Sequence, residues 1–560
     1  MPNQDDQSFS DKLFSKSWLP YLIIISLGFI LYARVISFDF TYLDDQPLIV
    51  ENYPFLSNLS NIFSAFTEDA FRSETDTYYR PLLTLSMMID AQLGGISLGM
   101  YHFTNILIHL AAACLLFLFL LKLGYRKEPS LLLGVIFAAH PVLTQAVAWV
   151  PGRNDSLMAV FTLLTAIMFL EYLDKKSIKY YIWHIGLFAV ALFTKESAIL
   201  FIAPLLFYLH FIRKEKLFSS TEIKLAAGWG AVIIIWFLLR SIALANPDKI
   251  NLFDLRFELL RNLPDGYLLY IGKALLPFNL TVLPTLGTTS IYGIITILAL
   301  VIILLTGKTK RLPYIIFGTL WFFIFLSLSF TFLAGEKLTT VALEHRIYLP
   351  LIGFVVVLME TDFVRNLNFK KGNALFISVC VIILFSGLTF AHSSHYKNRI
   401  AFWENAVENN KNLPTIHRIL SDMYYSEKML DKAEAELKVT LQLNPKEPGA
   451  NNSLGMIYMD KRMVKEAEES FRKETLLNPY NDKPFVNLGV VYFRQNRLKE
   501  AEEQWLKALG INQMNIDVYR NLILLYMQQK DYAKAKQLVR RLEEKGVRVP
   551  QEVINALKDK

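Results

Sequence analysis

A series of long apolar runs occupies most of the first 391 residues of this 560-residue chain. A helix that crosses a bilayer needs about twenty mostly apolar residues, and about eleven runs approach that length. They are 18–37, 101–123, 130–149, 156–173, 180–194, 197–213, 225–245, 287–306, 312–333, 346–361 and 373–391. Hydrophobic residues form 53% of the chain, more than in an ordinary soluble protein. The sequence therefore predicts an all-α fold with a polytopic membrane domain over 18–391.

Lys and Arg are distributed unequally between the short loops that join these runs. Five loops on one side hold fifteen of them, whereas three loops on the other side hold four. Because basic loops stay in the cytoplasm, the first set is predicted to be cytoplasmic, together with residues 1–17. The long loops 38–100 and 246–286 then lie outside, as does everything after about 392. The net charge of +8 fits loops that face anionic lipid and gives little support for nucleic-acid binding.

The two cysteines and the N-terminus exclude some further classes. Cys114 and Cys380 both fall inside apolar runs, so neither suggests a disulfide or a metal site. No small-residue cleavage site follows the run 18–37, and we interpret this run as a retained first span and not as a removed signal peptide.

Asp44 and Asp45 stand at the start of the first long outer loop. Two adjacent carboxylates at the mouth of a membrane protein would repel each other if partly buried, which raises at least one pKa. On local sequence alone, a solvated loop entrance is the favoured interpretation of the pair. A chemical role depends on what else lies on the same side of the membrane.

Polar side chains at the ends of the apolar runs gather on this outer side. His102, Asn105 and His109 are spaced i, i+3 and i+7, which places them on one face of a helix. The other members are His140, Arg153, Asp155, Lys195, Glu196, His345 and Arg346. Polar groups at membrane depth are costly and usually face a protein-lined cavity. We therefore expect a cavity shared with the two aspartates, although each residue alone also fits snorkelling or core packing.

Two segments of the outer loops have the composition of interfacial helices. Residues 81–93 and 265–276 are apolar with interspersed polar or aromatic residues. Such segments lie in the headgroup plane, and these two are predicted to wall a site that opens to lipid or simply to pack on the outer surface.

A 34-residue period begins where the apolar runs end. Leu420, Leu454, Leu488 and Leu522 are 34 residues apart, and so are Tyr424, Tyr458, Tyr492 and Tyr526. This period and pattern predict four tetratricopeptide repeats over 414–549, after a linker with half a repeat at 392–413 and before a tail at 550–560. The concave groove of such an α-solenoid holds extended peptide, which favours a protein acceptor or partner.

Several strings in the chain point to one family. They are Tyr42-Leu43-Asp44-Asp45, Tyr79-Arg80-Pro81-Leu82-Leu83, His102-Phe103-Thr104-Asn105, His140-Pro141-Val142-Leu143-Thr144-Gln145, Gly152-Arg153-Asn154-Asp155, Thr194-Lys195-Glu196-Ser197 and Glu344-His345-Arg346-Ile347-Tyr348-Leu349-Pro350. With the C-terminal repeats, the chain resembles the transmembrane O-mannosyltransferases that carry tetratricopeptide repeats, and it looks like a bacterial relative of them. Gln145 departs from the Glu expected in the His-Pro-Val motif, which puts in doubt any role that needs a carboxylate there.

The resemblance implies a multi-span GT-C glycosyltransferase in the bacterial inner membrane. Such a protein would move a sugar, mannose or another hexose, from a polyprenyl phosphate to Ser or Thr hydroxyls of extracytoplasmic proteins, with inversion. Asp44 is our first choice of general base, with Asp45 beside it. The donor phosphate would meet Arg346 first, then His345, Arg80, Arg153 and Lys195. His102, Asn105, His109, His140, Asp155 and Glu196 are predicted to line the cavity.

Other functions remain open from the sequence. The same fold could glycosylate a lipid or a cell-wall glycan, or serve as a non-catalytic membrane anchor for the repeats. A transporter is less well supported, because the chain lacks a matched pair of broken helices in two halves. No cofactor is indicated. The spacing of Asp and His matches no metal site, which leaves an Asp-bound divalent ion as an unsupported alternative.

Overall fold

The computed structural model describes residues 13–72, 78–244, 252–285, 290–308, 311–327, 342–369, 372–547 and 551–558, with backbone alone at 252–262, 290, 552–553 and 558. The described chain is predominantly α-helical, as predicted, and divides into two compact units, Met1–Asn409 and Asn410–Lys560. Parts of the predicted outer loop 246–286, of the run 312–333 and of the N-terminal segment 1–17 lie outside the described residues.

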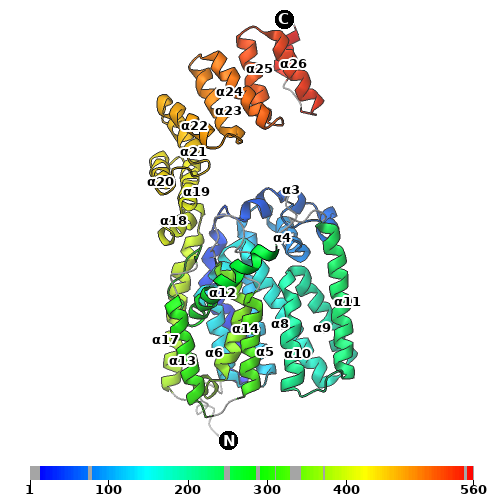
Figure 1. The fold of residues 1–560 in the computed structure, drawn as a ribbon. Coiled ribbons are helices and arrows are strands. Elements are labelled where there is room, and N and C mark those ends of the chain that lie inside the picture. The colour runs from blue at the N-terminus through cyan, green and yellow to red at the C-terminus, as the bar shows by residue number, and fades with distance from the viewer. Residues whose placement is uncertain are drawn as a thin grey trace. The chain divides into compact units, whose positions relative to one another are not determined.

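The first unit is a bundle of apolar helices that run roughly side by side (Figure 1). They are α2 (Leu19–Tyr32), α5 (Leu98–Lys122), α6 (Lys127–Ala138), α8 (Arg153–Lys175), α9 (Ile178–Thr194), α10 (Ile202–Phe207), α11 (Ser220–Ala243), α13 (Ser290–Thr306), α14 (Leu312–Ser327), α15 (Tyr348–Met359) and α17 (Gly372–Ser393). A helix satisfies its own backbone hydrogen bonds, which lipid cannot do, so apolar runs of this length become helices. Large apolar side chains such as Ile302, Ile234 and Phe237 stay exposed on the bundle surface, at 59%, 61% and 60%.

Five described helices are long and apolar enough to cross a membrane. They are Leu19–Ser37, Leu98–Lys122, Val150–Lys175, Ser220–Ala243 and Gly372–Tyr396. A sixth candidate consists of Lys127–Ala138 and Pro141–Ala148, which are bent by 46° at a break where Pro141 lacks a backbone N–H. Four shorter apolar helices accompany them. The chain is thus a multi-pass membrane protein by composition and architecture, and the count of about eleven spans remains a prediction.

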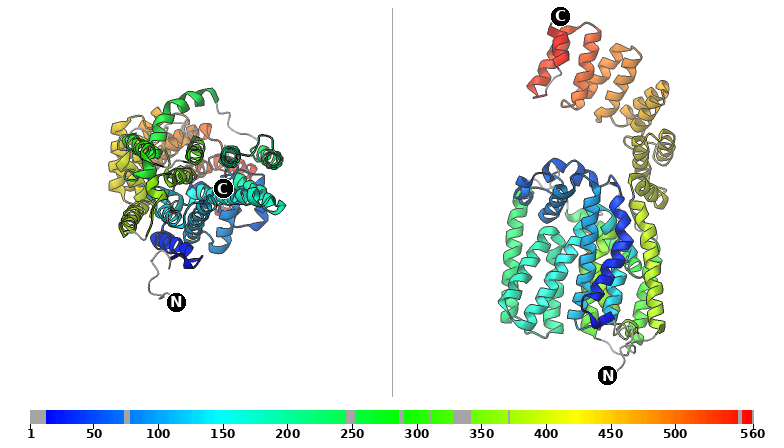
Figure 2. Two further views of the ribbon diagram at one scale, coloured as in Figure 1. Left: turned by 90° about the horizontal axis from the view of Figure 1, so that it is seen from below. Right: turned by 180° about the vertical axis from the view of Figure 1, so that it is seen from behind.

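One end of the bundle carries short and transverse helices. The segment after α2 forms α3 (Tyr53–Leu56) and α4 (Pro81–Gly94), and α12 (Leu252–Leu275) runs across the bundle direction (Figures 1 and 2). α4 begins at Pro81, whose fixed φ suits the first helical position. It packs through Leu83 and Met87 against Phe40 in a small core of its own. Both segments predicted as interfacial helices are therefore helical; whether they lie in the headgroup plane remains a prediction.

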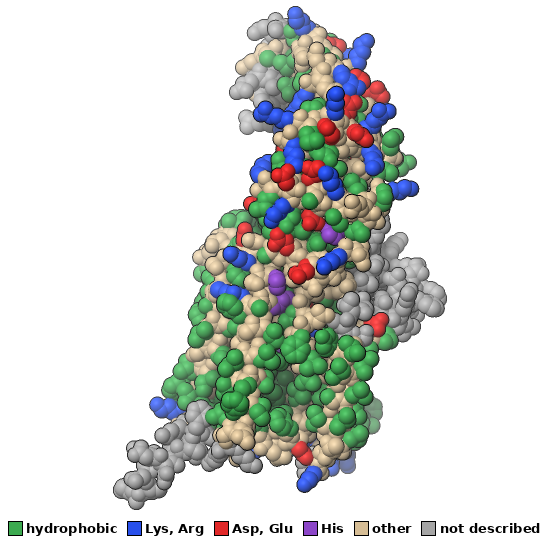
Figure 3. Space-filling view, turned by 90° about the vertical axis from the view of Figure 1, so that its left-hand side faces the viewer, with side chains coloured by type: hydrophobic (Ala, Val, Ile, Leu, Met, Phe, Trp, Pro, Cys, Tyr) green, Lys and Arg blue, Asp and Glu red, His purple; other side chains and the backbone are tan. Residues whose placement is uncertain are grey.

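The second unit consists of antiparallel helix pairs. They are α19 (Pro414–Ser426) with α20 (Leu430–Leu443), α21 (Ala450–Asp460) with α22 (Val464–Leu477), α23 (Asp482–Arg494) with α24 (Leu498–Ile511), and α25 (Ile516–Gln528) with α26 (Tyr532–Glu544), followed by α27 (Gln551–Lys558). A Cβ on Gly455 would fall 2.6 Å from the ring of Phe471, which explains the glycine of the repeat. The predicted tetratricopeptide solenoid is confirmed. Lys, Arg, Asp and Glu cluster on it, whereas hydrophobic side chains cover the bundle face in Figure 3.

Candidate active site

Asp45 closes a tight turn at the start of the first long loop, which the sequence predicts to lie outside. Its buried carboxylate accepts hydrogen bonds from the backbone N of Thr41 at 2.8 Å and from the Thr41 hydroxyl at 2.6 Å. Tyr42, inside the turn, has the unusual φ of 57°. Burial raises the pKa of Asp45 to about 7, although the Thr41 hydrogen bonds oppose the change. Asp45 is thus committed to holding the turn.

Asp44, in the same turn, is oriented differently. Its residue is only partly buried, and its carboxylate lies within electrostatic reach of Arg80 and Arg346. Burial raises the pKa of Asp44 above its ordinary value, against the lowering effect of the two arginines. The structure therefore brings together the first candidate base and two candidate phosphate-binding residues from distant parts of the chain.

Arg80 is held at the N-terminus of α4 by two contacts. Its guanidinium pairs with the Glu196 carboxylate at 3.2 Å and lies 4.6 Å from the centre of the Tyr78 ring. The Tyr78 phenol in turn feels the charges of Asp44 and Arg346, and burial raises its pKa. Tyr78 was not among the sequence candidates, because a tyrosine in a loop carries no spacing signal that points to a site.

A second ion pair lies beside the first. The Lys195 ammonium contacts both Asp155 carboxylate oxygens, at 2.7 and 2.8 Å, and the His345 Nε2 lies 3.6 Å from Asp155 Oδ2. The charges of Lys195, Arg346 and Arg80 all act on the His345 ring, so the four side chains share one region. We call the following set the Asp44 cluster: Asp44, Tyr78, Arg80, Asp155, Lys195, Glu196, His345 and Arg346.

Gln145 positions His345 of the Asp44 cluster. Its Oε1 accepts hydrogen bonds from the backbone N and from Nδ1 of His345, each at 3.0 Å, and its Nε2 donates to the Val282 carbonyl at 2.9 Å. The amide of Gln145 provides both an acceptor and a donor. A carboxylate has no N–H group, so it could not donate a hydrogen bond to the Val282 carbonyl. The departure from the family motif at this position therefore has a structural explanation in this chain.

Glu344 fixes the 3₁₀ turn η11 (Glu344–Ile347) that presents His345 and Arg346. Its buried carboxylate forms an ion pair with Lys273 of α12, accepts from the Thr281 backbone N at 3.1 Å, and lies 2.9 Å from His392 Nε2 of α17. A buried carboxylate with several partners resists displacement. The turn that carries Arg346 is consequently anchored to two other helices.

Helix α18 (Arg399–Asn409) completes the surroundings of the Asp44 turn. Trp403 Nε1 donates to the Thr41 carbonyl at 3.2 Å, and Asn405 Oδ1 accepts from the Val282 backbone N at 3.0 Å. The segment expected to be half a repeat thus contacts the candidate base's own turn, a link that sequence periodicity does not reveal.

Arg153 lies in the core and not in the Asp44 cluster. Its fully buried guanidinium pairs with the Asp90 carboxylate at 2.6 Å and donates to Asn105 Oδ1 at 2.6 Å and to the Tyr101 carbonyl at 2.7 Å. With these partners and no exposed surface, Arg153 does not fit the predicted contact with a donor phosphate, and Asn105 does not fit a cavity-lining position.

The three histidines that were predicted to line the cavity are also buried in packed structure. His109 Nδ1 lies 2.7 Å from the Tyr348 hydroxyl, and His140 Nε2 lies 3.1 Å from the Ala274 carbonyl. His102 is 1% exposed and packs near the Phe38 ring. The contacts of His109 and His140 match the core-packing alternative better than the predicted cavity lining, because a hydrogen-bonded buried imidazole stabilises helix contacts. His102 is equally buried, but among the described residues neither of its ring nitrogens has a hydrogen-bond partner. Among the described residues, no group of three His, Cys, Asp or Glu is arranged to hold a metal ion.

Comparison with known proteins identifies both parts of the chain. Residues 81–239 match the family described as dolichyl-phosphate-mannose-protein mannosyltransferase, and residues 448–481 match the tetratricopeptide repeat. This chain joins a region similar to that mannosyltransferase family to tetratricopeptide repeats. The family match contains Asp155, Lys195 and Glu196, while Asp44 and Arg346 lie outside it.

The curated relatives are named as protein O-mannosyl-transferases. Protein O-mannosyl-transferase F38B6.6 of Caenorhabditis elegans is 23% identical over 466 residues, which cover 79% of this chain and 65% of that protein. Protein O-mannosyl-transferase TMTC2 of Homo sapiens is 32% identical over 174 residues, 30% of this chain and 20% of its own length. The matches thus span less than two thirds of these relatives. The resemblance to O-mannosyltransferases with tetratricopeptide repeats is confirmed, and a bacterial origin stays a prediction.

Proposed function

We propose that this chain is a membrane glycosyltransferase that transfers a hexose, mannose by family, from a polyprenyl-phosphate donor to Ser or Thr hydroxyls of proteins. The observation that carries the proposal is the position of Asp44 beside Arg80 and Arg346. One carboxylate and two guanidiniums supply the base and the phosphate-binding charges that such a transfer needs. The names of the relatives support the protein acceptor and the sugar.

Asp44 is proposed as the general base. A base whose pKa is raised toward the working pH accepts a proton more readily than a free carboxylate does. As Asp44 takes the hydroxyl proton, the acceptor oxygen would attack the anomeric carbon from the face opposite the phosphate, and the configuration would invert. Asp45 is assigned the role of holding the turn, because both Thr41 donors occupy one of its oxygens.

Arg346 and Arg80 are proposed to receive the negative charge that develops on the leaving phosphate. Arginine binds phosphate oxygens in a planar, bidentate manner, and charge-assisted hydrogen bonds are stronger than neutral ones. Lys195 lies close by and would add a third cation, with Asp155 fixing its position. His345, positioned by Gln145, would face the same phosphate.

Two further features support a reaction at the outer membrane surface on a protein. The loop-rich end of the bundle carries the Asp44 cluster together with α4 and α12, whose bulk would exclude water that otherwise hydrolyses the donor. The tetratricopeptide solenoid offers a peptide-binding groove, which favours a protein acceptor over a lipid or a glycan. The predicted cytoplasmic N-terminus and extracytoplasmic solenoid complete this proposal.

The test uses the full chain in lipid nanodiscs with a polyprenyl-phosphate hexose and a Ser/Thr-containing peptide. Mass spectrometry of the peptide measures transfer by wild type, by Asp44→Asn and by Asp39→Asn, the last being an exposed carboxylate in the same loop. Transfer is expected from wild type and Asp39→Asn and not from Asp44→Asn. Equal transfer by all three, or none by the wild type toward peptide while a lipid is modified, would contradict the proposal.

A further inference from the structure

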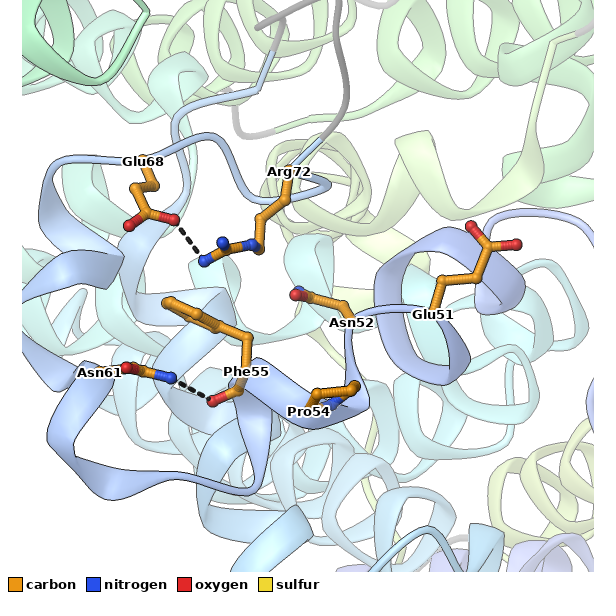
Figure 4. A pocket seen from close by; sticks show the side chains of 7 residues that line it. All are labelled: Glu51, Asn52, Pro54, Phe55, Asn61, Glu68 and Arg72. Carbon is orange, nitrogen blue, oxygen red and sulfur yellow. Dashed lines mark hydrogen bonds and ion pairs between the residues drawn. The ribbon is translucent and has the colours of Figure 1, made fainter. Parts of the chain in front are cut away.

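The first outer loop contains a second polar hollow, apart from the Asp44 cluster. It has a volume of about 370 Å³ and is formed by the segment 51–72 (Figure 4). That volume falls at the lower end of the range for small-ligand sites. The segment 51–72 is hydrogen-bonded to the cluster, since the backbone N of Ala70 donates to the Tyr78 carbonyl at 2.8 Å, but none of the residues that line the hollow belongs to the Asp44 cluster.

Asn52 contributes a buried acceptor to this hollow that is not hydrogen-bonded. The residue is 4% exposed, and its Nδ2 donates to the Ala70 carbonyl at 3.4 Å, while its Oδ1 has no hydrogen-bond partner among the residues that the structure describes. Figure 4 shows the amide pointing between Arg72 and Phe55 into the hollow. A buried acceptor without a donor costs free energy, so this oxygen favours a ligand that carries an O–H or N–H donor.

The charges around Asn52 restrict that ligand further. Arg72 forms an ion pair with Glu68, and its guanidinium lies 4.2 Å from the centre of the Phe55 ring (Figure 4). The guanidinium repels a cation, while Glu68 and the nearby Glu51 repel an anion. A neutral ligand rich in hydroxyl groups can donate a hydrogen bond to Asn52 Oδ1 and accept one from the Arg72 guanidinium. The Phe55 ring at the edge of the hollow offers an apolar surface to the C–H groups of such a ligand.

We propose that this hollow binds a neutral hexose, at a site distinct from the Asp44 cluster. Its hydroxyls would donate to Asn52 Oδ1 and accept from the Arg72 guanidinium, with Asn61 and Phe55 forming the floor. Free sugar and a sugar already carried by a polypeptide present the same chemistry. The proposal does not depend on transferase activity, because binding can be measured without turnover.

The experiment titrates methyl α-mannoside, methyl α-glucoside and methyl α-galactoside onto the full chain in nanodiscs prepared without sugar detergents. Saturation-transfer NMR reports binding. We expect saturable binding of at least one glycoside with a Kd of about 1 mM, corresponding to about −4 kcal/mol. Asn52→Leu and Arg72→Met should each weaken it at least tenfold. Thr67→Ala, an exposed neighbour outside the hollow, and Asp44→Asn should leave the affinity within twofold.

Two comparisons make the outcome decisive. Arg72 is exposed, so Arg72→Met tests the site even if Asn52→Leu does not fold. A pair of peptides distinguishes free sugar from sugar attached to a polypeptide as the natural ligand. If the hollow binds polypeptide-attached sugar, an O-hexosylated Ser/Thr peptide should compete with the glycoside, and the same peptide without sugar should not. The proposal is overturned by absence of saturable binding, by unchanged affinity in folded Arg72→Met, by equal loss in Asp44→Asn, or by equal competition from the unmodified peptide.

Discussion

Two groups of charged side chains in the first unit look alike in sequence and differ in their surroundings. The Arg153–Asp90 pair is fully buried, and its guanidinium has three kinds of partner. The Asp44 cluster places Asp44, Arg80 and Arg346 within electrostatic reach while Asp44 and Arg346 keep part of their surface accessible. Buried pairs with complete hydrogen bonding fix a structure, whereas partly accessible charges can exchange partners with a substrate. We therefore propose a structural role for the first group and a chemical role for the second.

The largest expected effect is the loss of transfer activity when Asp44 is replaced. Asp44→Asn should lower transfer by about 10²–10⁴-fold, the usual contribution of a general base, with little change in thermal stability. The measurement is peptide hexosylation together with a melting curve of the purified protein. A strongly destabilised Asp44→Asn variant would place Asp44 with the structural group instead.

Substitution of Arg346 tests whether the cations of the Asp44 cluster stabilise the leaving phosphate. Arg346→Gln should reduce the rate of transfer by about 10²–10³-fold, because a preorganised donor to the developing charge is lost. Arg346→Lys should recover only part of that rate, since lysine cannot bind a phosphate in two places. Rates at saturating donor for the three proteins are the measurement. A change confined to donor KM would show that Arg346 binds the ground state and the transition state equally.

The Arg153–Asp90 pair should respond in stability. Asp90→Asn leaves a buried guanidinium without its counter-charge, and such a loss costs about 3–5 kcal/mol. We expect a lower yield of folded protein and a lower melting temperature. The double variant Asp90→Leu/Arg153→Leu, which removes both charges, should recover part of the stability. If Asp90→Asn melts like wild type while transfer is lost, the pair belongs to the chemistry.

The last prediction concerns the pH dependence of stability and Asp45. The pKa of Asp45 is about 7 in the folded protein, against about 3.9 for an unfolded aspartate, so the folded state binds more protons between these values. The contribution of Asp45 to stability therefore declines as pH rises from about 4 to 7. Asp45→Asn should flatten that part of the melting-temperature profile. A profile identical to wild type would mean that Asp45 is ionised throughout this range.

The elements that the sequence predicts well are those whose signal is local or periodic. Spacing alone locates the tetratricopeptide helices, and apolar length locates the bundle helices. Pairing across long separations is not visible in this way. Arg153 and Arg346 both stand at the predicted outer end of an apolar run, yet Arg153 pairs with Asp90 of α4 and becomes part of the core. The role of Gln145 likewise depends on His345, 200 residues later.

The hydrogen bond from Trp403 to the Thr41 carbonyl joins positions separated by 362 residues. During synthesis, the turn that carries Asp44 emerges early, but its partner in α18 emerges only after every helix of the bundle. The turn therefore gains its last contact when the membrane unit is finished. A chain interrupted before α18 would enter the membrane with its candidate base incompletely fixed, so its chemistry would begin only once the bundle is complete.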